Sequence, residues 1–296
     1  MNAIVLRSGI LALGLSLAAA AGSATAPRAE GAEVKRVSER LIPFVPGGEL
    51  RIEDKNGRIT VEGWPRNEVR IQITRVVRAE DRAKAEELMK ELEADVEVRS
   101  DRIDIQSRFP KRRESIGIWD ILGRKVASLQ INYYVQVPND TNLDLRTSNG
   151  EVRVNGVNGH VEATTTNGDM RVGDVKGDVT LSTTNGEIEI TGVSGQATAL
   201  TTNGSVVAEV RKIPAQGKVK LETTNGNVEA YLPADLRATV EAMTTNGRVA
   251  IDFPITHEGL MTSKSIRGTI KGGGAKLYLA TTNGNVDVRK LGERKR

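Results

Sequence analysis

The chain has 296 residues with 42 basic and 38 acidic side chains, and its net charge of +4 is too small to drive binding to nucleic acids or membranes by itself. Aromatic residues make up only 3%, too few for a surface that stacks nucleic-acid bases. The sequence contains no cysteine, which excludes disulfides, thiolate metal sites and a lipidated N-terminal cysteine. We therefore expect no cofactor, no nucleic-acid partner and no lipoprotein.

The N-terminus has the order of a secretory signal peptide. Arg7 precedes an apolar, Ala- and Leu-rich run from Ile10 to Ala21, and small residues follow the run. We predict a signal peptide over residues 1–26, with cleavage between 22 and 29; an uncleaved anchor is the alternative. The mature chain would be periplasmic or secreted, with no later transmembrane span.

An Asn-Gly step, usually preceded by two Thr, recurs through the second half of the chain. Its Asn residues are Asn149, Asn167, Asn185, Asn203, Asn225, Asn246 and Asn283. The spacings are 18, 18, 18, 22, 21 and 37, so either one coil in the last interval has lost its marker or a loop interrupts it. Apolar residues stand at positions −6, −4, +3 and +5 from each Asn, and Thr stands at −2, which is the period-two pattern of strands buried on one face.

Two architectures compete for this pattern. Asn-Gly between alternating strands is the usual signal for a β-hairpin, which would build a sandwich or prism. A solenoid instead stacks equivalent positions of successive coils about 4.8 Å apart, so that Asn and Thr can form hydrogen bonds along a column. We predict an all-β fold: a β-solenoid of the single-stranded β-helix type, with coils of 18–22 residues over residues 141–290.

The N-terminal part is predicted to cap this solenoid over residues 33–140. Leu50 and Ile52 hold the apolar positions before Asn56, while Asp54 stands where Thr is usual. We interpret this segment as a diverged terminal repeat of the kind that solenoids need at their ends.

One helix is predicted within this cap region, between the diverged repeat and the regular coils. Residues 80–93 place apolar side chains at i, i+3, i+4 and i+7, with Asp81 as the N-cap. Segments 69–77, 96–105 and 131–137 are strand-like. We expect the helix to cover an open end or edge of the β-structure.

A family resemblance follows from these motifs. The segment G-x-L-x-I-x-x-x-N-G-x-I-x-V-x-G-W at 48–64, the helical insertion and the serial T-[ST]-N-G-x-[VIM]-x-[VI] units resemble a bacterial family of domains of unknown function with adhesin-type β-strand repeats. The likeness covers about residues 34–290. It implies a β-solenoid envelope protein without established catalytic residues, and some relatives are linked with envelope stress signalling.

Acidic residues follow three successive Asn-Gly steps. Glu151, Asp169 and Glu187 would stack in neighbouring coils, an arrangement that acid–base catalysis or a hard cation could use. The alternative is a solvated strand face, on which Arg153 and Arg171 supply counter-charges.

A long insertion at residues 108–128 combines basic and apolar side chains. Lys111, Arg112 and Arg113 precede an apolar string that contains Trp119. Such a segment can dock on an anionic lipid surface or a protein groove. The alternative, which we favour, is a lid that lies on the solenoid.

Two hypotheses of function remain. The first is an exported, non-enzymatic β-solenoid that serves as a binding or structural, adhesin-like module of the bacterial cell envelope. Its partner would be an envelope protein, a glycan or an anionic lipid surface. The second is a polysaccharide-active β-helix enzyme that uses the three stacked carboxylates. The basic tail at 291–296 is interpreted as a solvated end.

Overall fold

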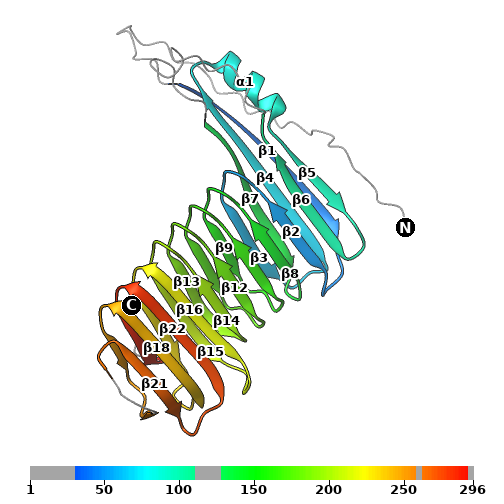
Figure 1. The fold of residues 1–296 in the computed structure, drawn as a ribbon. Helices are drawn as coiled ribbons and strands as arrows, with labels where there is room; N and C mark the ends of the chain where they lie inside the picture. Colours follow the sequence, from blue (N-terminus) through cyan, green and yellow to red (C-terminus); the bar gives the residue numbers. More distant parts are fainter. Residues whose placement is uncertain (1–30, 111–127, 258–261, 293–296) are drawn as a thin grey trace.

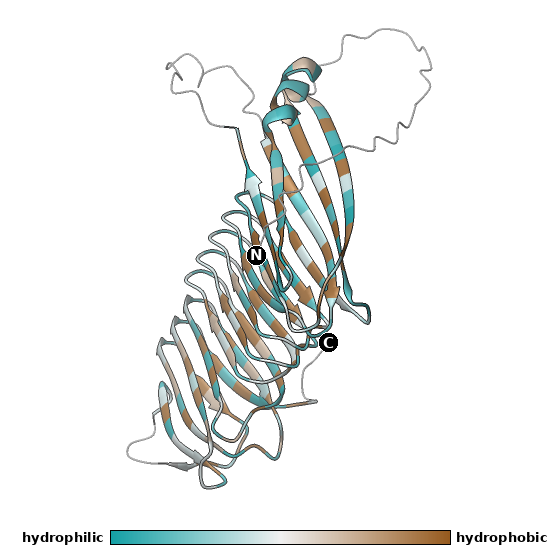
Figure 2. Cartoon of the chain, turned by 90° about the vertical axis from the view of Figure 1, so that its right-hand side faces the viewer, coloured by the Kyte–Doolittle hydropathy of each residue, from teal (hydrophilic) through white to brown (hydrophobic). Residues whose placement is uncertain are grey.

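The fold is all-β, with two large sheets along an elongated stack and one short helix in the part that is described. The structure is a computed structural model that describes residues 31–110, 128–257 and 262–292. Apolar and polar residues alternate along the strands (Figure 2), and the apolar ones pack between the sheets in one continuous core. One sheet has 11 strands and the other has 12 (Figure 1).

The elements divide into three groups along the chain. The first group is β1 (Ala32–Pro43), β2 (Glu49–Glu53), β3 (Ile59–Trp64), β4 (Glu68–Ala79), α1 (Arg82–Glu91), β5 (Glu93–Val98), β6 (Arg102–Arg108) and β7 (Ser128–Pro138). The second is β8 (Asn142–Arg146), β9 (Val152–Asn155), β10 (Val161–Thr164), β11 (Met170–Gly173), β12 (Val179–Ser182), β13 (Ile188–Ser194), β14 (Ala197–Leu200), β15 (Val206–Lys212), β16 (Lys218–Asn225) and β17 (Val228–Leu232). The third is β18 (Ala238–Asn246), β19 (Val249–Ile251), β20 (Thr256–His257), β21 (Ser265–Ile270), β22 (Ala275–Asn283) and β23 (Val286–Lys290).

The second group forms the regular coils. From β8 to β17 the chain alternates between the two sheets, and each strand pairs in parallel with the equivalent strand of the next coil. Val161 pairs with Val179 and Met170 with Ile188, so equivalent repeat positions stack one above another. The apolar positions that the sequence pattern predicts face the core in these coils.

The Asn-Gly steps are corners between the two sheets, and the hairpin alternative is wrong for the regular coils. The only non-glycine residues with positive φ in the described ranges are Asp174 and Lys271, so no Asn of these steps adopts the type I′ hairpin conformation. Glycine is required by the close approach of neighbouring coils. A Cβ on Gly186 would lie only 2.0 Å from the carbonyl oxygen of Gly168.

The 37-residue interval contains an interruption, which is one of the two explanations that the sequence suggested, and the stack also changes its order there. After β19 the chain forms β20 and β21, and β21 pairs antiparallel to β18 at one edge. Strand β22 then returns between β16 and β18, and β23 lies between β17 and β19. The last coil is therefore inserted between the two coils that precede it in the sequence.

The N-terminal end departs from the predicted cap in two ways. Strands β2 and β3 pair with β8 and β9 as a member of the stack, but β6 and β7 lie outside them, so this diverged repeat is not the terminal coil. The strand-like segment 96–105 is not one strand but the ends of two antiparallel strands, β5 and β6, joined by a turn at residues 99–101. Long strands β1 and β4 complete the 11-stranded sheet in antiparallel pairing.

Helix α1 confirms the expected N-cap. The Asp81 side chain accepts a hydrogen bond from the backbone N–H of Lys84 at 2.7 Å. Ala85 and Met89 are buried against β1 and β4, and the helix carries the chain from β4 in one sheet to β5 in the other (Figure 1). In the described ranges no helix combines the length and the apolar character needed to cross a bilayer.

Candidate functional site: the Asn-Gly corners and the charged face beside them

The Asn side chains of the corners form a continuous ladder of amide hydrogen bonds. From Asn167 onward, each Asn Nδ2 donates to the Asn Oδ1 of the neighbouring coil at 2.7–2.8 Å, whereas the Asn149 Nδ2 donates to the Lys55 carbonyl oxygen at 3.4 Å. The spatial order of the ladder is Asn149, Asn167, Asn185, Asn203, Asn225, Asn283 and Asn246. At the N-terminal end Asn56 leaves this pattern, because its amide donates to the carbonyl oxygen of Leu129.

Below the Asn ladder lies a column of buried threonines at position −2. Thr183 and Thr201 are 5% and 8% exposed, and their hydroxyls donate to the carbonyl oxygens of Gly168 and Gly186 in the neighbouring coil. From Asn167 onward, each corner is thus held by one exposed amide and one buried hydroxyl. The polar repeat residues stabilise the stack and are engaged with one another.

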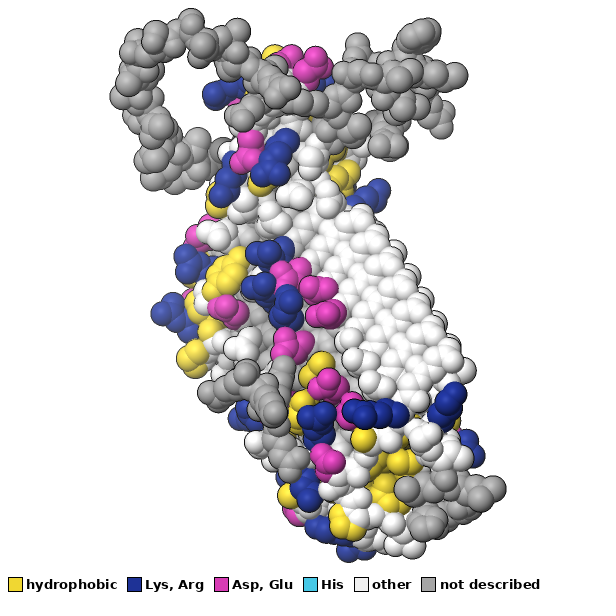
Figure 3. Space-filling model, turned by 90° about the vertical axis from the view of Figure 1, so that its left-hand side faces the viewer, with side chains coloured by type: hydrophobic (Ala, Val, Ile, Leu, Met, Phe, Trp, Pro, Cys, Tyr) yellow, Lys and Arg dark blue, Asp and Glu magenta, His cyan; other side chains and the backbone are white. Residues whose placement is uncertain are grey.

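The residue just before each Asn points outward. These positions hold Ser148, Thr166, Thr184, Thr202, Thr224, Thr245 and Thr282, and all are exposed. Figure 3 shows the result as a broad band without charged or apolar side chains along one side of the stack, with acidic and basic side chains beside it. The molecule therefore presents a regular, uncharged polar strip next to a charged face.

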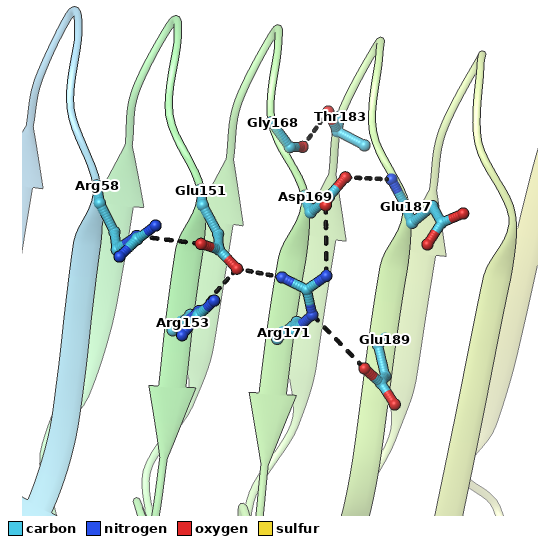
Figure 4. Close-up of polar contacts among 9 residues, drawn as sticks. All are labelled: Arg58, Glu151, Arg153, Gly168, Asp169, Arg171, Thr183, Glu187 and Glu189. Atoms are coloured by element: carbon cyan, nitrogen blue, oxygen red, sulfur yellow. Dashed lines mark hydrogen bonds and ion pairs between the residues drawn. The ribbon is translucent and has the colours of Figure 1, made fainter. Parts of the chain in front are cut away.

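Glu151 is the centre of that charged face. Its carboxylate contacts Arg58 at 3.1 Å, Arg153 at 2.7 Å and also Arg171, and its side chain is only 15% exposed (Figure 4). Burial favours the neutral acid, but the hydrogen bond from Arg153 and the charges of the three arginines outweigh burial and lower the pKa of Glu151. Glu151 is therefore a carboxylate that three coils share.

Asp169 and Glu187 are also engaged by their neighbours. The Asp169 carboxylate accepts the backbone N–H of Glu187 at 3.0 Å and contacts Arg171 at 3.4 Å. Arg171 also reaches Glu189 at 3.7 Å, so one guanidinium links three coils (Figure 4). The Glu187 carboxylate is exposed.

This geometry does not resemble a pair of catalytic carboxylates. A general acid at neutral pH needs a raised pKa, whereas the pKa of Glu151 is lowered by its arginines. Within the described part of the chain no group of three or more His, Asp or Glu residues is placed to hold a metal ion. The chemistry that the face supports is ion pairing between coils and recognition of polar or charged surfaces.

A hollow of about 540 Å³ opens beside this face over the N-terminal coils. Its lining includes Arg58, Asn132, Tyr134 and Glu151. These groups already bind one another or their neighbours: the Arg58 backbone N–H donates to Asn132 and the Tyr134 hydroxyl to Glu62. The hollow is an open surface lined mainly by polar side chains.

A buried polar group that the sequence analysis did not assign a role lies at the N-terminal coil. Asp54 occupies the threonine column at 5% exposure, and its carboxylate accepts a hydrogen bond from the hydroxyl of Ser107. The Ser107 oxygen lies 2.6 Å from the hydroxyl oxygen of Tyr133, which is 2% exposed. Burial raises the pKa of Asp54 to about 6, although the Ser107 hydrogen bond lowers it in part. The sequence signal that could have identified this group is the acid Asp54 at a position where the other repeats have Thr.

The candidate docking residues Lys111, Arg112, Arg113 and Trp119 lie outside the described residues. Their flanking strands β6 and β7 belong to the outermost coil at the N-terminal end. Most of the basic tail, residues 293–296, lies outside the described ranges as well.

Comparisons with known proteins agree with the repeat architecture. The family model of Toastrack DUF4097 matches residues 27–289. A comparison with curated protein sequences found no match.

Three solved structures are similar over most of the chain. A candidate cell adhesion protein of Clostridium sporogenes shares 11% identity over 86% of this chain and 100% of its own, with a TM-score of 0.33. A candidate adhesin of Bacteroides fragilis shares 8% identity over 86% of this chain and 97% of its own, with a TM-score of 0.39. A candidate lipid-binding protein of Parabacteroides distasonis shares 12% identity over 85% of this chain and 96% of its own, with a TM-score of 0.35.

Proposed function

Because the chain belongs to the Toastrack DUF4097 family, we propose that it is an exported, non-enzymatic binding or structural module of the bacterial cell envelope. Its partner class is an envelope protein, a glycan or an anionic lipid surface. The β-solenoid of 18–22-residue coils provides a stiff support for such contacts, because neighbouring coils are joined by backbone ladders and by the Asn and Thr columns.

The observation that carries this proposal is the state of the three stacked carboxylates. Glu151 is bound by three arginines, and Asp169 accepts a backbone N–H and contacts Arg171. The polysaccharide-active alternative needs one of these groups as a general acid and another as a base. The ion pairs that hold both carboxylates between neighbouring coils support a structural role for the column.

Export is supported by the sequence. The order of Arg7, the apolar run to Ala21 and the small residues after it is typical of a signal peptide, and the family match begins at residue 27. We propose cleavage between residues 22 and 29 and a periplasmic or secreted mature chain. Because the sequence contains no cysteine, we propose that the mature chain is not a lipoprotein.

Two measurements on the protein recovered from its own bacterium test this proposal. We expect mass spectrometry to find a processed N-terminus between residues 22 and 29 in the envelope or secreted fraction. We also expect no turnover of acidic polysaccharides. An unprocessed cytoplasmic chain would contradict export. Turnover that is lost when Glu151, Asp169 and Glu187 are changed to Gln would establish the enzyme alternative instead.

The insertion at residues 108–128 is proposed as either a docking element or a lid, and one variant separates these roles. We change Lys111, Arg112 and Arg113 to Gln and Trp119 to Ala, then measure vesicle binding and thermal unfolding. Docking predicts about 100-fold weaker binding to phosphatidylglycerol vesicles at unchanged stability, since each basic residue near an anionic surface contributes about 1 kcal/mol. A lid, which we favour, predicts a stability loss of about 3 kcal/mol from the missing Trp119 side chain and unchanged vesicle binding.

A further inference from the structure

The four ends of the two sheets differ in length. In the described ranges the 12-stranded sheet ends on β5, with six residues, and on β20, with two. The 11-stranded sheet ends on β19, with three residues, and on β1, with twelve. Natural sheets usually keep exposed edges short, because a long free edge is a template for another strand. Strand β1 is the exception in this molecule.

The same strand concentrates exposed apolar side chains. Among the described residues, the large hydrophobic side chains that are exposed are Val37, Leu41 and Val45, at 51%, 56% and 50%. Val37 and Leu41 lie on β1, and Val45 lies two residues beyond its last residue. Because residues i and i+2 of a strand point to the same face, Lys35, Val37 and Glu39 share the outer face with Leu41. The opposite face holds the buried Val34.

The outer face of β1 is complementary to itself when the strand pairs antiparallel about Val37. In that register Val37 lies opposite Val37 of a second copy. A residue any number of positions after Val37 then lies opposite the residue the same number of positions before it in the other copy. Lys35 lies opposite Glu39 of the second copy, and Glu39 lies opposite its Lys35. A two-fold axis at Val37 thus places one apolar pair between two pairs of opposite charge, which is the cross-strand pattern that stabilises antiparallel sheets.

We propose that β1 is a self-association edge through which two copies of this chain form an antiparallel dimer centred on Val37. The dimer continues the 11-stranded sheet of one copy into that of the other through backbone hydrogen bonds of β1. The inner faces of the two copies lie on the same side of the continued sheet, so α1 of each copy remains packed on its own β1 and β4. The partner is a second copy because β1 is complementary to itself in antiparallel pairing. Lys35 faces Glu39 of the other copy, and Val37 faces Val37.

The absence of cysteine gives a direct test of the register. Opposite residues of an antiparallel pair have Cα atoms about 4.5–5.5 Å apart, within the range of about 4.4–6.8 Å that a disulfide needs. We expect Val37→Cys to form a disulfide-linked dimer under mild oxidation. Leu41→Cys is the matched control on the same face, because the two Leu41 positions would lie roughly 26 Å apart. Equal cross-linking of both variants, or none at Val37→Cys, overturns the proposal.

The charge pairs give a second test, which needs no cross-link. Analytical ultracentrifugation of the exported protein should show a concentration-dependent dimer. Lys35→Glu places two acids opposite each other and should weaken the dimer by about tenfold or more, with an unchanged melting temperature. Adding Glu39→Lys reverses both charges and should restore the dimer. Because Glu39 also contacts Arg70 within one copy, Glu33→Lys, which loses the similar contact to Arg78, controls for the lost ion pair.

The outcomes leave the proposal open to refutation. A wild-type chain that stays monomeric at every concentration overturns it, as does a double variant that remains as weak as Lys35→Glu alone. If another segment of this chain or an envelope protein covers β1, the wild type is monomeric and Val37→Cys stays unlinked, and the second copy is excluded as the occupant. Neither result bears on export or on the charged face, so this proposal and the proposed function fail independently.

Discussion

From Thr165 onward, each buried threonine of the −2 column donates to a glycine carbonyl of the neighbouring coil, whereas Asp54, at the same position of the β2–β3 coil, bonds to Ser107 of β6. The difference follows from the neighbour. The coil next to Asp54 is formed by β6 and β7, and its chain runs through the 108–128 insertion where the regular coils have Asn-Gly. Threonine therefore occupies the −2 column where the neighbouring coil supplies a glycine carbonyl as its hydrogen-bond acceptor.

The largest effect should come from breaking the facing pattern inside a regular coil. Ile188 is 1% exposed, so Ile188→Asp buries an unpaired charge and should cost about 4 kcal/mol or more of unfolding free energy. Glu187→Lys changes an exposed side chain on the adjacent position and should stay within about 0.5 kcal/mol. Chemical denaturation of both variants measures these values. Similar losses in the two would show that the strand register is wrong.

A pH series can sharpen the contrast between the two kinds of coil. The pKa of Asp54 is raised from 3.8 to about 6 in the folded chain, so the unfolded state releases this proton first as the pH rises. Stability from the protonated acid is therefore complete below about pH 4 and is lost by about pH 6. Over this 2.2-unit difference the loss approaches about 3 kcal/mol, at 1.36 kcal/mol per unit.

Asp54→Asn removes this titration. We expect the variant to match the wild type in unfolding free energy near pH 3, after allowance for its lost hydrogen bond, and to exceed it at pH 7. Urea unfolding at pH 3, 5 and 7 gives the slope for each protein. An identical slope in wild type and variant between pH 4 and 6 would assign the pH dependence to other groups.

The smallest effect distinguishes the middle of the Asn ladder from its end. The Asn185 amide donates to Asn167 and accepts from Asn203, whereas Asn246 donates to Asn283 at the end of the ladder. At about 1 kcal/mol for each net hydrogen bond, Asn185→Ala should cost about 2 kcal/mol and Asn246→Ala about half as much. Thermal unfolding of the matched pair is the measurement. Equal costs would mean that the amide ladder adds little to the stability of the stack.

The strand faces of the regular coils could be predicted because two-residue alternation and burial are local properties. Ile188 and Thr183 face inward and Glu187 outward, as the spacing around Asn185 indicates. The role of glycine could be predicted only in part. Sequence identifies Gly186 as a corner residue, but the 2.0 Å approach to the Gly168 carbonyl depends on which coil lies next to it.

The order of the stack could not be predicted from spacing. The coils around Asn225 and Asn246 offer the same Asn, Thr and Gly partners, so the coil around Asn283 fits between them as well as at an end. The ion pairs of Glu151 were predicted in part, since Arg153 and Arg171 were identified as counter-charges. Arg58 was missed because its coil is far away in the sequence and adjacent in the stack.

The inserted coil has a consequence for the order of events during synthesis. From β10 to β17 the coils can join a growing stack in their order along the chain, because each one pairs with the coil that precedes it in the sequence. Strands β18 and β19 are made next, yet their final parallel neighbours β22 and β23 do not exist at that moment. Until β22 is made, the place between β16 and β18 is empty. Direct pairing of β18 with β16 is therefore a competing arrangement, because it uses the same Asn and Thr partners. Maturation ends with a closing step inside the stack, which waits for the last residues to be translated.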